Sequence, residues 1–494
     1  MKTVQEVQKL LIGLAQTTLI GKLPERIVQL QQDSRQVAEG DVFFAIRGTQ
    51  VDGHRFISAA YEQGAALVIG EAPPEDLLIP PERAYLQVPD AAEAMGQIAH
   101  RYYGKPSEQF DLVGVTGTNG KTTVVTLLFQ LFLELGYNTG LISTIQNQIN
   151  DNILPSTHTT PDTLSLHKLL AQMLAARCTH VFMEVSSHAV VQRRIAGANF
   201  RGAVFTNISH DHLDFHKTFA NYIKAKKKFF DDLPPTAFAL VNKDDKRGSV
   251  MVQNTQARVH TFAQKLFGDY QVRVLENSLN GLHLTIREEE FLARLVGNFN
   301  AYNLGVVYAV ADLLGESPAT FLPLLSGLKG VAGRLEQVAA PDFYAFVDYA
   351  HTPDALENVL KTLSNLRETP SQRILTVVGC GGNRDREKRP KMAAIAEKYS
   401  DRLFLTSDNP RGEDPMTILH EMEAGLSVLG RGKVETLPDR REAIRKAVQV
   451  AQKGDLILVA GKGHETYQET KGVRHPFDDR LELRRCIAEK ENHA

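Results

Sequence analysis

A glycine-rich segment between a strand-like run and a helix-like run constrains the fold of this chain more than any other feature. The apolar run 112–115 leads into Gly114-Val-Thr-Gly117-Thr-Asn-Gly120-Lys121-Thr122-Thr123, and residues 122–135 are dense in apolar side chains. Glycines let the backbone wrap until its N–H groups face phosphate oxygens, and the amino terminus of the following helix adds positive potential. Lys121 would then reach the β and γ phosphates of a nucleotide, and Thr122 could hold Mg²⁺. The segment predicts a phosphate-binding loop in an α/β sheet.

This loop departs in one respect from the general phosphate-loop pattern. That pattern, G-x-x-x-x-G-K-[ST], requires glycine at position 115, where this chain has valine, and the glycines stand at 114 and 117 instead. The alternative is an ordinary Gly-rich turn that happens to contain Gly-Lys-Thr, but the strand–turn–helix context favours a phosphate site. We also find no clear run of apolar residues ending in Asp-Glu, which counts against a P-loop switch or motor ATPase.

Strand-like runs alternate with helical stretches over most of the chain, a pattern typical of a doubly wound α/β sheet. After the glycine-rich loop, the strand-like runs are 181–185, 203–206, 237–241, 344–347, 373–378, 402–406 and 455–460. Residues 1–104 mix short strands and helices, as at 41–47 and 66–70. The sequence therefore predicts an α/β protein.

The length of the chain predicts more than one domain. At 494 residues it exceeds what one hydrophobic core supports. Gly104-Lys105-Pro106 is a plausible first linker, and a second boundary falls near Val331-Ala-Gly333. We therefore predict domains at 1–104, 105–332 and 333–494, and a single large α/β domain with insertions is the alternative.

Composition argues against several classes of function. The formal net charge of −2 shows no basic excess, so a general nucleic-acid or anionic-membrane surface is not expected. Three cysteines, Cys178, Cys380 and Cys486, are far apart and make neither a disulfide framework nor a Cys-x-x-Cys metal site. No secretory signal and no run of about 18 apolar residues is present. We expect a soluble, cytoplasmic protein without membrane insertion.

Hard metal ligands gather after two of the predicted strands. Glu184 ends one strand, where a carboxylate points into the crevice in which α/β proteins bind ligands. The segment 207–216, Asn-Ile-Ser-His-Asp-His-Leu-Asp-Phe-His, follows the next strand. Each histidine alone is more often a structural or surface residue, but together with a phosphate loop the group fits a Mg²⁺-dependent site.

Two further motifs have plain interpretations when they are taken alone. The lysines of Tyr222-Ile-Lys-Ala-Lys226-Lys-Lys form a basic helical face, and the chemistry of the sequence does not distinguish Lys226 from its neighbours. Gly379-Cys-Gly-Gly-Asn-Arg384-Asp suggests a dinucleotide fingerprint, but the G-x-G-x-x-G spacing fails after the second glycine. We therefore do not expect a Rossmann cofactor there.

The chain resembles the Mur ligase family over essentially its whole length. Gly-Thr-Asn-Gly-Lys-Thr-Thr at 117–123 is similar to the loop that this family shares with folylpolyglutamate synthases. Asp33-Ser34-Arg35 with the following Gly40-Asp-Val-Phe-Phe-Ala resembles its UDP-binding segment, and Asp408-Asn409-Pro410-Arg411 resembles members that add diaminopimelate. The resemblance implies three domains: a smaller mixed α/β amino-terminal domain, a central P-loop-type doubly wound sheet and a Rossmann-like carboxyl-terminal domain.

The resemblance also implies a reaction. It implies an ADP-forming, ATP-dependent ligase that joins meso-diaminopimelate to UDP-N-acetylmuramoyl-L-alanyl-D-glutamate through an acyl phosphate, with ATP and Mg²⁺ bound. Such an enzyme makes a peptidoglycan precursor in the cytoplasm and so serves cell-wall biogenesis, cell shape and cell division. The alternatives are a folylpolyglutamate synthase-like ligase, which would lack the UDP-binding domain and Asp-Asn-Pro-Arg, and a P-loop switch ATPase.

Residue roles follow from the same resemblance. It assigns ATP contacts to Gly117, Thr118, Asn119, Gly120, Lys121, Thr122, Thr123, Asn303, Arg334 and Asp348. It assigns the nucleotide-linked substrate to Ser34, Gln50, Thr159, Thr160, Ser186, Gln192 and Arg194, and the amino acid to Arg384, Asp408, Asn409, Pro410, Arg411, Gly461 and Glu465. The implied metal ligands are Thr122, Glu184, His212 and Lys226, with Lys226 carbamylated by CO₂ so that it binds metal as a carboxylate does. The implied catalytic residues are Lys121, Lys226, Glu184 and His212.

Overall fold

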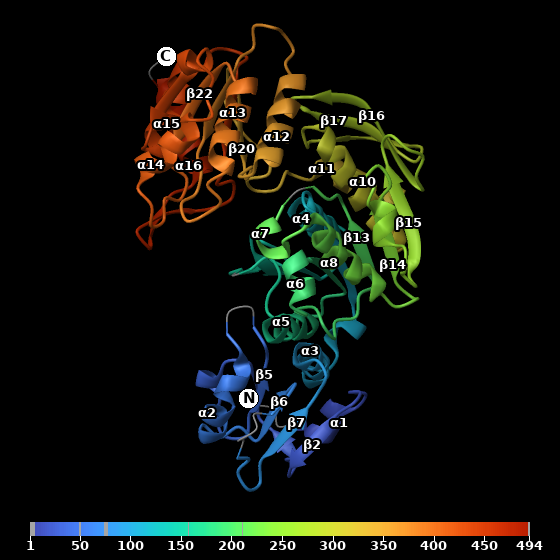
Figure 1. Ribbon diagram of the computed structural model, residues 1–494. Coiled ribbons are helices and arrows are strands. Elements are labelled where there is room, and N and C mark those ends of the chain that lie inside the picture. The colour runs from blue at the N-terminus through green and yellow to red at the C-terminus, as the bar shows by residue number, and fades with distance from the viewer. Residues whose placement is uncertain (1–4, 49–50, 74–77, 157, 210, 493–494) are drawn as a thin grey trace. The chain divides into compact units, whose positions relative to one another are not determined.

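The computed structural model describes residues 5–48, 51–73, 78–156, 158–209 and 211–492. The chain divides into two compact units, Met1–Thr261 and Phe262–Ala494 (Figure 1). The first unit contains an amino-terminal sheet and the parallel sheet that carries the glycine-rich loop. The second unit contains antiparallel strands and the carboxyl-terminal sheet.

The amino-terminal sheet has the strand order β2-β7-β6-β5-β4. Its strands are β2 (Thr18–Gly21), β4 (Leu30–Gln31), β5 (Val42–Ala45), β6 (Leu67–Gly70) and β7 (Ala84–Gln87). A short ladder joins β1 (Gln5–Glu6) to β3 (Arg26–Ile27). The apolar side chains of β5 and β6 alternate between two faces. One face packs on α2 (Ile57–Glu62), and the other packs on α1 (Val7–Leu11) and α3 (Ala91–Tyr102).

Through the first unit, the larger sheet has the order β11-β10-β9-β12-β8-β13-β14-β15. Its parallel strands include β8 (Asp111–Thr116), β9 (Thr139–Ile142), β12 (His180–Glu184), β13 (Gly202–Phe205) and β14 (Phe238–Asn242). Beside them lie the hairpin of β10 (Asn147–Ile149) and β11 (Asn152–Leu154), and β15 (Arg258–Ala263). The predicted parallel strands of this region are confirmed.

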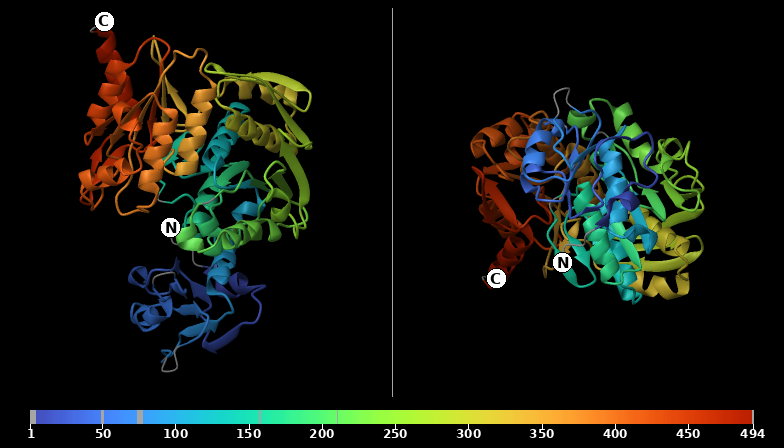
Figure 2. Two further views of the ribbon diagram at one scale, coloured as in Figure 1. Left: turned by 45° about the horizontal axis from the view of Figure 1, so that its top comes forward. Right: turned by 90° about the horizontal axis from the view of Figure 1, so that it is seen from below.

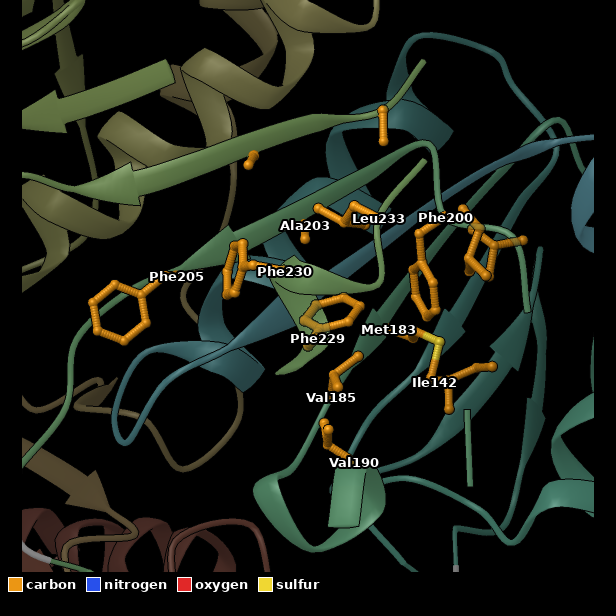
Figure 3. Packing of buried hydrophobic residues seen from close by; sticks show 14 of the residues in the cluster. Ile142, Met183, Val185, Val190, Phe200, Ala203, Phe205, Phe229, Phe230 and Leu233 are labelled. Atoms are coloured by element: carbon orange, nitrogen blue, oxygen red, sulfur yellow. The ribbon is translucent and has the colours of Figure 1, made fainter. Parts of the chain in front are cut away.

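Helices cover both faces of this sheet, which is why its strands are continuous apolar runs. On one face lies α4 (Lys121–Glu134), where the Phe132 ring is centred 5.0 Å from the Phe182 ring of β12. The apolar cluster on the other face, shown in Figure 3, includes residues of α5 (Thr163–Ala175), α6 (Ser187–Val191) and α8 (Phe219–Asp231). The short helices α7 (Leu213–His216) and α9 (Gly248–Met251) flank α8.

Gly114 explains why the loop departs from the general phosphate-loop pattern. A β carbon at Gly114 would lie 2.6 Å from Phe229 and 2.8 Å from Phe200. These two rings pack edge to face, with centroids 4.9 Å apart, in the core of the sheet (Figure 3). Gly120, in contrast, caps α4 in the left-handed conformation, with φ at 89°. The glycine at 114 therefore serves packing, and Val115 is a core residue.

Helix α3 touches the turn after α6 backbone to backbone. A β carbon on Gly96 would lie 2.3 Å from the carbonyl oxygen of Ala196, and one on Gly197 would lie 2.4 Å from the carbonyl oxygen of Gly96. From the same turn, Arg193 reaches Asp90 at 3.3 Å. The amino-terminal sheet and the parallel sheet are thus joined through a contact that admits only glycine on either side.

The second unit begins with antiparallel strands. These are β16 (Tyr270–Ser278), β17 (Gly281–Ile286) and β18 (Glu289–Ala293), and α10 (Asn298–Leu313) and α11 (Pro318–Gly327) follow them. This hairpin region was not predicted, although Asn280-Gly281 between two alternating runs is a strong hairpin signal.

The carboxyl-terminal sheet has the order β19-β20-β24-β21-β22-β23. Its strands are β19 (Glu336–Val338), β20 (Tyr344–Asp348), β21 (Ile374–Val378), β22 (Arg402–Thr406), β23 (Val434–Leu437) and β24 (Leu456–Ala460), and all but β19 are parallel. Because β24 and β22 both flank β21, the loops that follow these three strands meet at one edge.

Helices also cover both faces of this second parallel sheet, as Figure 2 shows. One face packs on α12 (Pro353–Asn365), α13 (Lys388–Tyr399) and α14 (Pro415–Glu423), and the other on α15 (Arg440–Val450) and α16 (Asp479–Asn492). A hairpin of β25 (Tyr467–Thr470) and β26 (Val473–Pro476) completes the domain. The predicted α/β class is confirmed, whereas the residue bounds of the three domains stay a prediction.

Among the helices in the described part of the chain, none is both long enough and apolar enough to cross a bilayer.

Candidate active site

The glycine-rich loop is held in place by the segment that follows β13. Thr206 donates from Oγ1 to the carbonyl oxygen of Asn119 at 2.6 Å. The Asn207 side chain accepts from the N–H of Asn119 at 3.0 Å and donates to its carbonyl oxygen at 3.1 Å. The N–H of Thr118 donates to the carbonyl oxygen of Asn207 at 2.8 Å. Thr206 was not predicted as a site residue, and Asn207 was predicted only as part of the metal-ligand segment 207–216. Both hold in place a loop whose helix dipole favours phosphate.

Lys121 is the first residue of α4 and bridges the loop. Its Nζ donates to the carbonyl oxygens of Gly117 at 3.0 Å and Thr118 at 2.9 Å. Thr122 and Thr123, both buried, follow it on the first turn of the helix. The predicted loop residues 117–123 therefore lie together, with a cation, hydroxyl groups and a helix amino terminus at one place.

The structure distinguishes Lys226 from the other lysines of α8. Lys226 is 1% exposed. Lys227 and Lys228 instead pair with acidic residues one turn later, at 2.5 and 2.7 Å. The two neighbours thus have the ordinary role of a basic helical face, and Lys226 points into the sheet.

The amine of Lys226 lies against the phosphate loop. It donates to the carbonyl oxygen of Gly117 at 2.9 Å and stands 4.8 Å from the centre of the Tyr222 ring. Burial lowers the pKa of Lys226 well below its ordinary value, and the charge of Lys121 lowers it further, against an opposing effect from Asp211. Both effects favour the neutral, nucleophilic form of the amine.

Glu184 offers an unsatisfied carboxylate oxygen at the end of β12. The residue is fully buried, and its Oε1 accepts from the N–H of Thr144 at 2.8 Å. Its Oε2 has no hydrogen-bond partner among the described residues. A buried anionic oxygen is costly unless a cation or a donor completes it. With the hydroxyl of Thr122 on the adjoining helix, this donor chemistry fits a hard cation such as Mg²⁺.

His212 lies at the start of α7 with φ at 54°, and its side chain is 46% exposed. Its ring is centred 4.8 Å from that of His188 and 6.2 Å from that of Tyr222. The hydroxyl of Tyr222 shares a hydrogen bond with that of Thr118 at 3.1 Å, and its ring also contacts Lys226. Tyr222, which was not predicted, thus connects His212, Lys226 and the phosphate loop.

The residues assigned to the peptide part of the nucleotide-linked substrate form one network beside Glu184. The Thr160 hydroxyl donates to a carbonyl of β12 at 2.8 Å and accepts from the N–H of Ser186 at 3.1 Å. Arg194 donates to the carbonyl oxygen of Thr160 and to the side chain of Gln192, both at 2.9 Å. The Thr159 hydroxyl accepts from a threonine of the β9–β10 loop at 3.0 Å.

The residues assigned to UDP are only partly described. Asp33 accepts from the N–H of Arg35 at 3.1 Å and from its guanidinium at 2.9 and 2.8 Å. The hydrogen bond from Arg35 lowers the pKa of Asp33 to about 2. Ser34 is partly exposed in this turn, and Gln50 lies outside the described residues. Their contact with UDP stays a prediction.

In the second unit, the loops after β21 and β22 bring two arginines to the same glycine. A β carbon at Gly381 would lie 2.8 Å from Nη1 of Arg411 and 3.8 Å from Cγ of Arg384. Arg411 donates to the carbonyl oxygen of Gly382 at 3.0 Å, and Arg384 is exposed. The guanidinium of Arg411 and the aliphatic stem of Arg384 thus lie beside the same glycine, and a guanidinium is a group that binds a ligand carboxylate at two points.

Asn409 is the centre of a buried network in the same region. Its Oδ1 accepts from Nζ of Lys462 at 3.1 Å and from the N–H of Glu469 at 2.9 Å. Its Nδ2 donates to Glu465 at 2.8 Å, and Lys462 donates to the same carboxylate oxygen at 2.9 Å. Lys462 is fully buried and was not predicted, although it stands in a Gly-Lys-Gly turn directly after a strand.

Asp408, Pro410 and Gly461 complete this group. A β carbon on Gly461 would lie 2.7 Å from Oδ2 of Asp408, so glycine keeps the loop after β24 close to the loop after β22. Pro410 is buried between Asn409 and Arg411 and restricts their backbone. The residues that were predicted to bind the incoming amino acid therefore lie close together in the structure.

The remaining residues assigned to ATP lie in the second unit. Asp348 ends β20, and its two oxygens accept from backbone N–H groups at 2.6 and 2.7 Å. Burial raises the pKa of Asp348. The guanidinium of Arg334 lies 4.7 Å from the centre of the Tyr349 ring. Asn303, on α10, is buried and donates to another asparagine of that helix at 2.8 Å. Their contact with ATP stays a prediction.

Comparison with known families gives three matches along the chain. Residues 26–103 match the Mur ligase family, catalytic domain; residues 115–311 match the Mur ligase middle domain; and residues 333–463 match the Mur ligase, glutamate ligase domain. The three-domain form of the predicted α/β fold is thereby confirmed.

Full-length relatives agree with these matches. A UDP-N-acetylmuramoyl-L-alanyl-D-glutamate–2,6-diaminopimelate ligase from Cytophaga hutchinsonii is 51% identical over 98% of this chain and 99% of its own length. One from Geobacillus thermodenitrificans is 41% identical over 96% and 99%.

Solved structures show the same likeness. A structure of a UDP-N-acetylmuramoyl-L-alanyl-D-glutamate–2,6-diaminopimelate ligase is 34% identical with a TM-score of 0.71, over 94% of this chain and 96% of that one. A folylpolyglutamate synthase from Thermotoga maritima, at 15% identity and a TM-score of 0.57, covers 74% of this chain and 89% of its own, which is a likeness of fold alone. From its family matches, its relatives and its loop chemistry, the chain belongs to the Mur ligase family.

Proposed function

We propose that this chain is an ATP-dependent, ADP-forming ligase that joins meso-diaminopimelate to UDP-N-acetylmuramoyl-L-alanyl-D-glutamate, a step in the synthesis of a peptidoglycan precursor. Relatives that are 51% and 49% identical over 98% of the chain carry this activity in their names. In the structure, the observation that carries the proposal is the meeting of Arg384 and Arg411 at Gly381.

Two arginines beside Gly381 would let the site distinguish diaminopimelate from lysine. The two amino acids share the reacting end, and diaminopimelate carries one more carboxylate beside its distal amine. A guanidinium binds a carboxylate in two-point geometry, and Arg384 can brace the same group that Arg411 binds. With lysine bound, the guanidinium would have no ligand carboxylate to bind, and sites of this kind reject the deficient analogue by roughly 10⁴-fold.

The reaction needs an activated acyl group, because a free carboxylate does not form an amide in water. The D-glutamyl γ-carboxylate attacks the γ-phosphorus of ATP, and ADP leaves. The amine of the incoming amino acid then attacks the acyl carbon, and phosphate leaves. Lys121 exchanges its two loop carbonyl partners for phosphate oxygens, and the N–H groups at the start of α4 hold the phosphates in place.

Thr122, Glu184, His212 and carbamylated Lys226 are the residues that would hold Mg²⁺, which neutralises phosphate charge when it is bound. The unpartnered Oε2 of Glu184 supports this assignment. Lys226 becomes a ligand when its neutral amine attacks the carbon of CO₂ and loses a proton. Its burial and lowered pKa favour that neutral form.

The other predicted roles complete the proposal. Ser34 and Gln50 bind UDP in a domain at 1–104, the network at Thr160 and Arg194 binds the muramoyl-dipeptide in a domain at 105–332, and the amino acid binds in a domain at 333–494. A cytoplasmic location is proposed because ATP and nucleotide-linked cell-wall precursors are cytoplasmic.

An assay of ADP release tests the function. We expect release only when UDP-muramoyl-dipeptide and diaminopimelate are both present, across a panel of amino acids that includes lysine and glutamate. ATP hydrolysis without the dipeptide would instead indicate a P-loop switch, and glutamate addition to a folate would indicate a folylpolyglutamate synthase-like ligase.

A further inference from the structure

Arg389, the second residue of α13, is a fully buried cation that none of the proposed binding steps uses. Its Nη1 donates to Glu413 at 2.9 Å and to Glu421 at 2.6 Å, and its Nη2 donates to the other oxygen of Glu413 at 2.9 Å. The fork of the guanidinium thus grips Glu413 at two points, which fixes direction as well as distance.

Both members of this ion pair also hold the backbone of the loop after β21. Nη2 of Arg389 donates to the carbonyl oxygen of Gly381 at 3.3 Å. Glu413 accepts from the N–H of Asn383 at 2.5 Å. Gly381 is the residue at which the two arginines of the amino-acid site meet, and Asn383 directly precedes Arg384.

Glu413 itself belongs to the loop after β22, two residues beyond Arg411. Further bonds join the two loops. The N–H of Gly382 donates to the carbonyl oxygen of Asn409 at 2.9 Å, and the N–H of Gly412 donates to the side chain of Asn383 at 2.9 Å. Arg389 and Glu413 therefore fasten two loops, each of which presents one arginine to the ligand.

The cost of the arrangement argues for a function. The side chains of Arg389 and Glu413 are 0% and 15% exposed. An ion pair with so little access to water is often no more stabilising than apolar residues of similar volume, because its charges lose most of their hydration. The helices α13 and α14 already pack through buried apolar residues such as Met392 and Ile418. What an apolar pair would not supply is the hydrogen bonding to Gly381 and Asn383.

We propose that the Arg389–Glu413 pair is a positioning clamp that sets the spacing between Arg384 and Arg411, and that it thereby determines the preference for an amino acid with a distal carboxylate. Neither clamp residue is a catalytic residue, since each acts through the loops. This inference rests on the proposed function.

The experiment measures kcat and KM for diaminopimelate and for lysine in wild type, Arg389→Gln, Arg389→Lys and Glu413→Gln. Arg373→Gln is the matched control. Arg373 forms an ion pair of the same kind with Asp455 at 2.6 Å, but at the amino ends of β21 and β24, far from the loops in question.

We expect Arg389→Gln to raise the KM for diaminopimelate by about 10²-fold, the loss typical of a misplacement of about 1 Å. The KM values for ATP and for the nucleotide-linked substrate should stay unchanged, and the diaminopimelate-to-lysine ratio of kcat/KM should fall. Arg389→Lys, which keeps the charge, should recover part of the loss. Arg373→Gln should leave all of these values unchanged.

A folded Arg389→Gln variant with a wild-type KM for diaminopimelate and a wild-type ratio would overturn the proposal. So would equal losses for both amino acids in kcat alone, which is the result of a purely structural role. If Arg389→Gln melts below the assay temperature, Glu413→Gln decides, because it keeps the volume and an acceptor for Asn383. A wild type that prefers lysine would defeat the proposed function instead, and the clamp is then judged on the KM for lysine.

Discussion

The amine of Lys226 and the amine of Lys121 donate to the same carbonyl oxygen, that of Gly117, at 2.9 and 3.0 Å. Two cations with one neutral acceptor between them are unfavourable in a buried place, and the charge of Lys121 is one cause of the lowered pKa of Lys226. The pair therefore divides its roles. We propose that Lys121 is the cation that binds phosphate, and the lowered pKa of Lys226 favours the neutral amine that carbamylation requires.

Replacement of Lys121 by alanine removes the ammonium of the phosphate loop. We expect turnover to fall by about 10³-fold or more, since single charge-stabilising groups of this kind have such effects. The measurement is ADP release at saturating substrates, with circular dichroism as the check on folding. Turnover that remains within about tenfold of wild type would remove this loop from the active site.

Lys226→Ala should be nearly inactive, because an alanine cannot carry a carbamate. Added short-chain carboxylic acids should restore part of the activity by filling the space with a carboxylate. Lys227→Ala and Lys228→Ala are the matched controls, and both should keep wild-type turnover because these lysines pair with acidic residues at the carboxyl end of α8 and not with the phosphate loop. Full activity of Lys226→Ala, or the same response to acetate in all three variants, would contradict the carbamate.

Arg411→Ala tests the choice of amino acid. Wild type should prefer diaminopimelate over lysine by roughly 10⁴-fold in kcat/KM, because lysine brings no carboxylate for the guanidinium to bind. The variant should lose most of that preference while its KM for ATP is unchanged. Wild-type preference for lysine, or an unchanged ratio in the variant, would defeat the assignment.

Because His167 is buried as a neutral imidazole, we expect the free energy of unfolding to fall in mild acid. His167 is fully buried, its Nε2 bonds to the carbonyl oxygen of Ala196 at 2.8 Å, and burial lowers its pKa to about 4. The unfolded state takes up the proton first, so the stabilisation is complete above about pH 6.5 and is lost as the pH falls toward 4. The difference between the pKa of 6.5 in the unfolded state and about 4 in the folded state corresponds to a loss of about 3 kcal/mol in the free energy of unfolding.

The measurement for this prediction is urea unfolding at pH 7.5 and at pH 5. His167→Gln keeps an N–H donor but does not titrate, so its stability should change less between the two values. If the variant shows the same pH dependence as wild type, other groups cause the effect. One such group is His100, since its ring is centred 5.5 Å from that of His167 and burial also lowers its pKa.

The sequence predicted those features that depend only on short, continuous stretches of residues. The strand–turn–helix at the phosphate loop and the parallel strands follow from apolar runs and glycine spacing, and both are confirmed. The choice of Lys226 among its neighbours could not be predicted from residue chemistry, because it depends on which side of α8 faces the sheet. Arg389 and Lys462 were missed for the same reason, since a charged residue near a helix start or in a turn is usually solvated.

The contact between Gly96 and Gly197 limits how ligases of this kind can be recombined. Arg194, three residues before Gly197, binds the carbonyl oxygen of Thr160 at 2.9 Å. The turn that packs against α3 is therefore the same segment that carries Arg194, a residue assigned to the peptide part of the nucleotide-linked substrate. A chimaera whose first domain comes from a homologue should therefore also take residues 193–198 from that homologue. A side chain at either glycine would clash with the facing backbone and separate α3 from this turn.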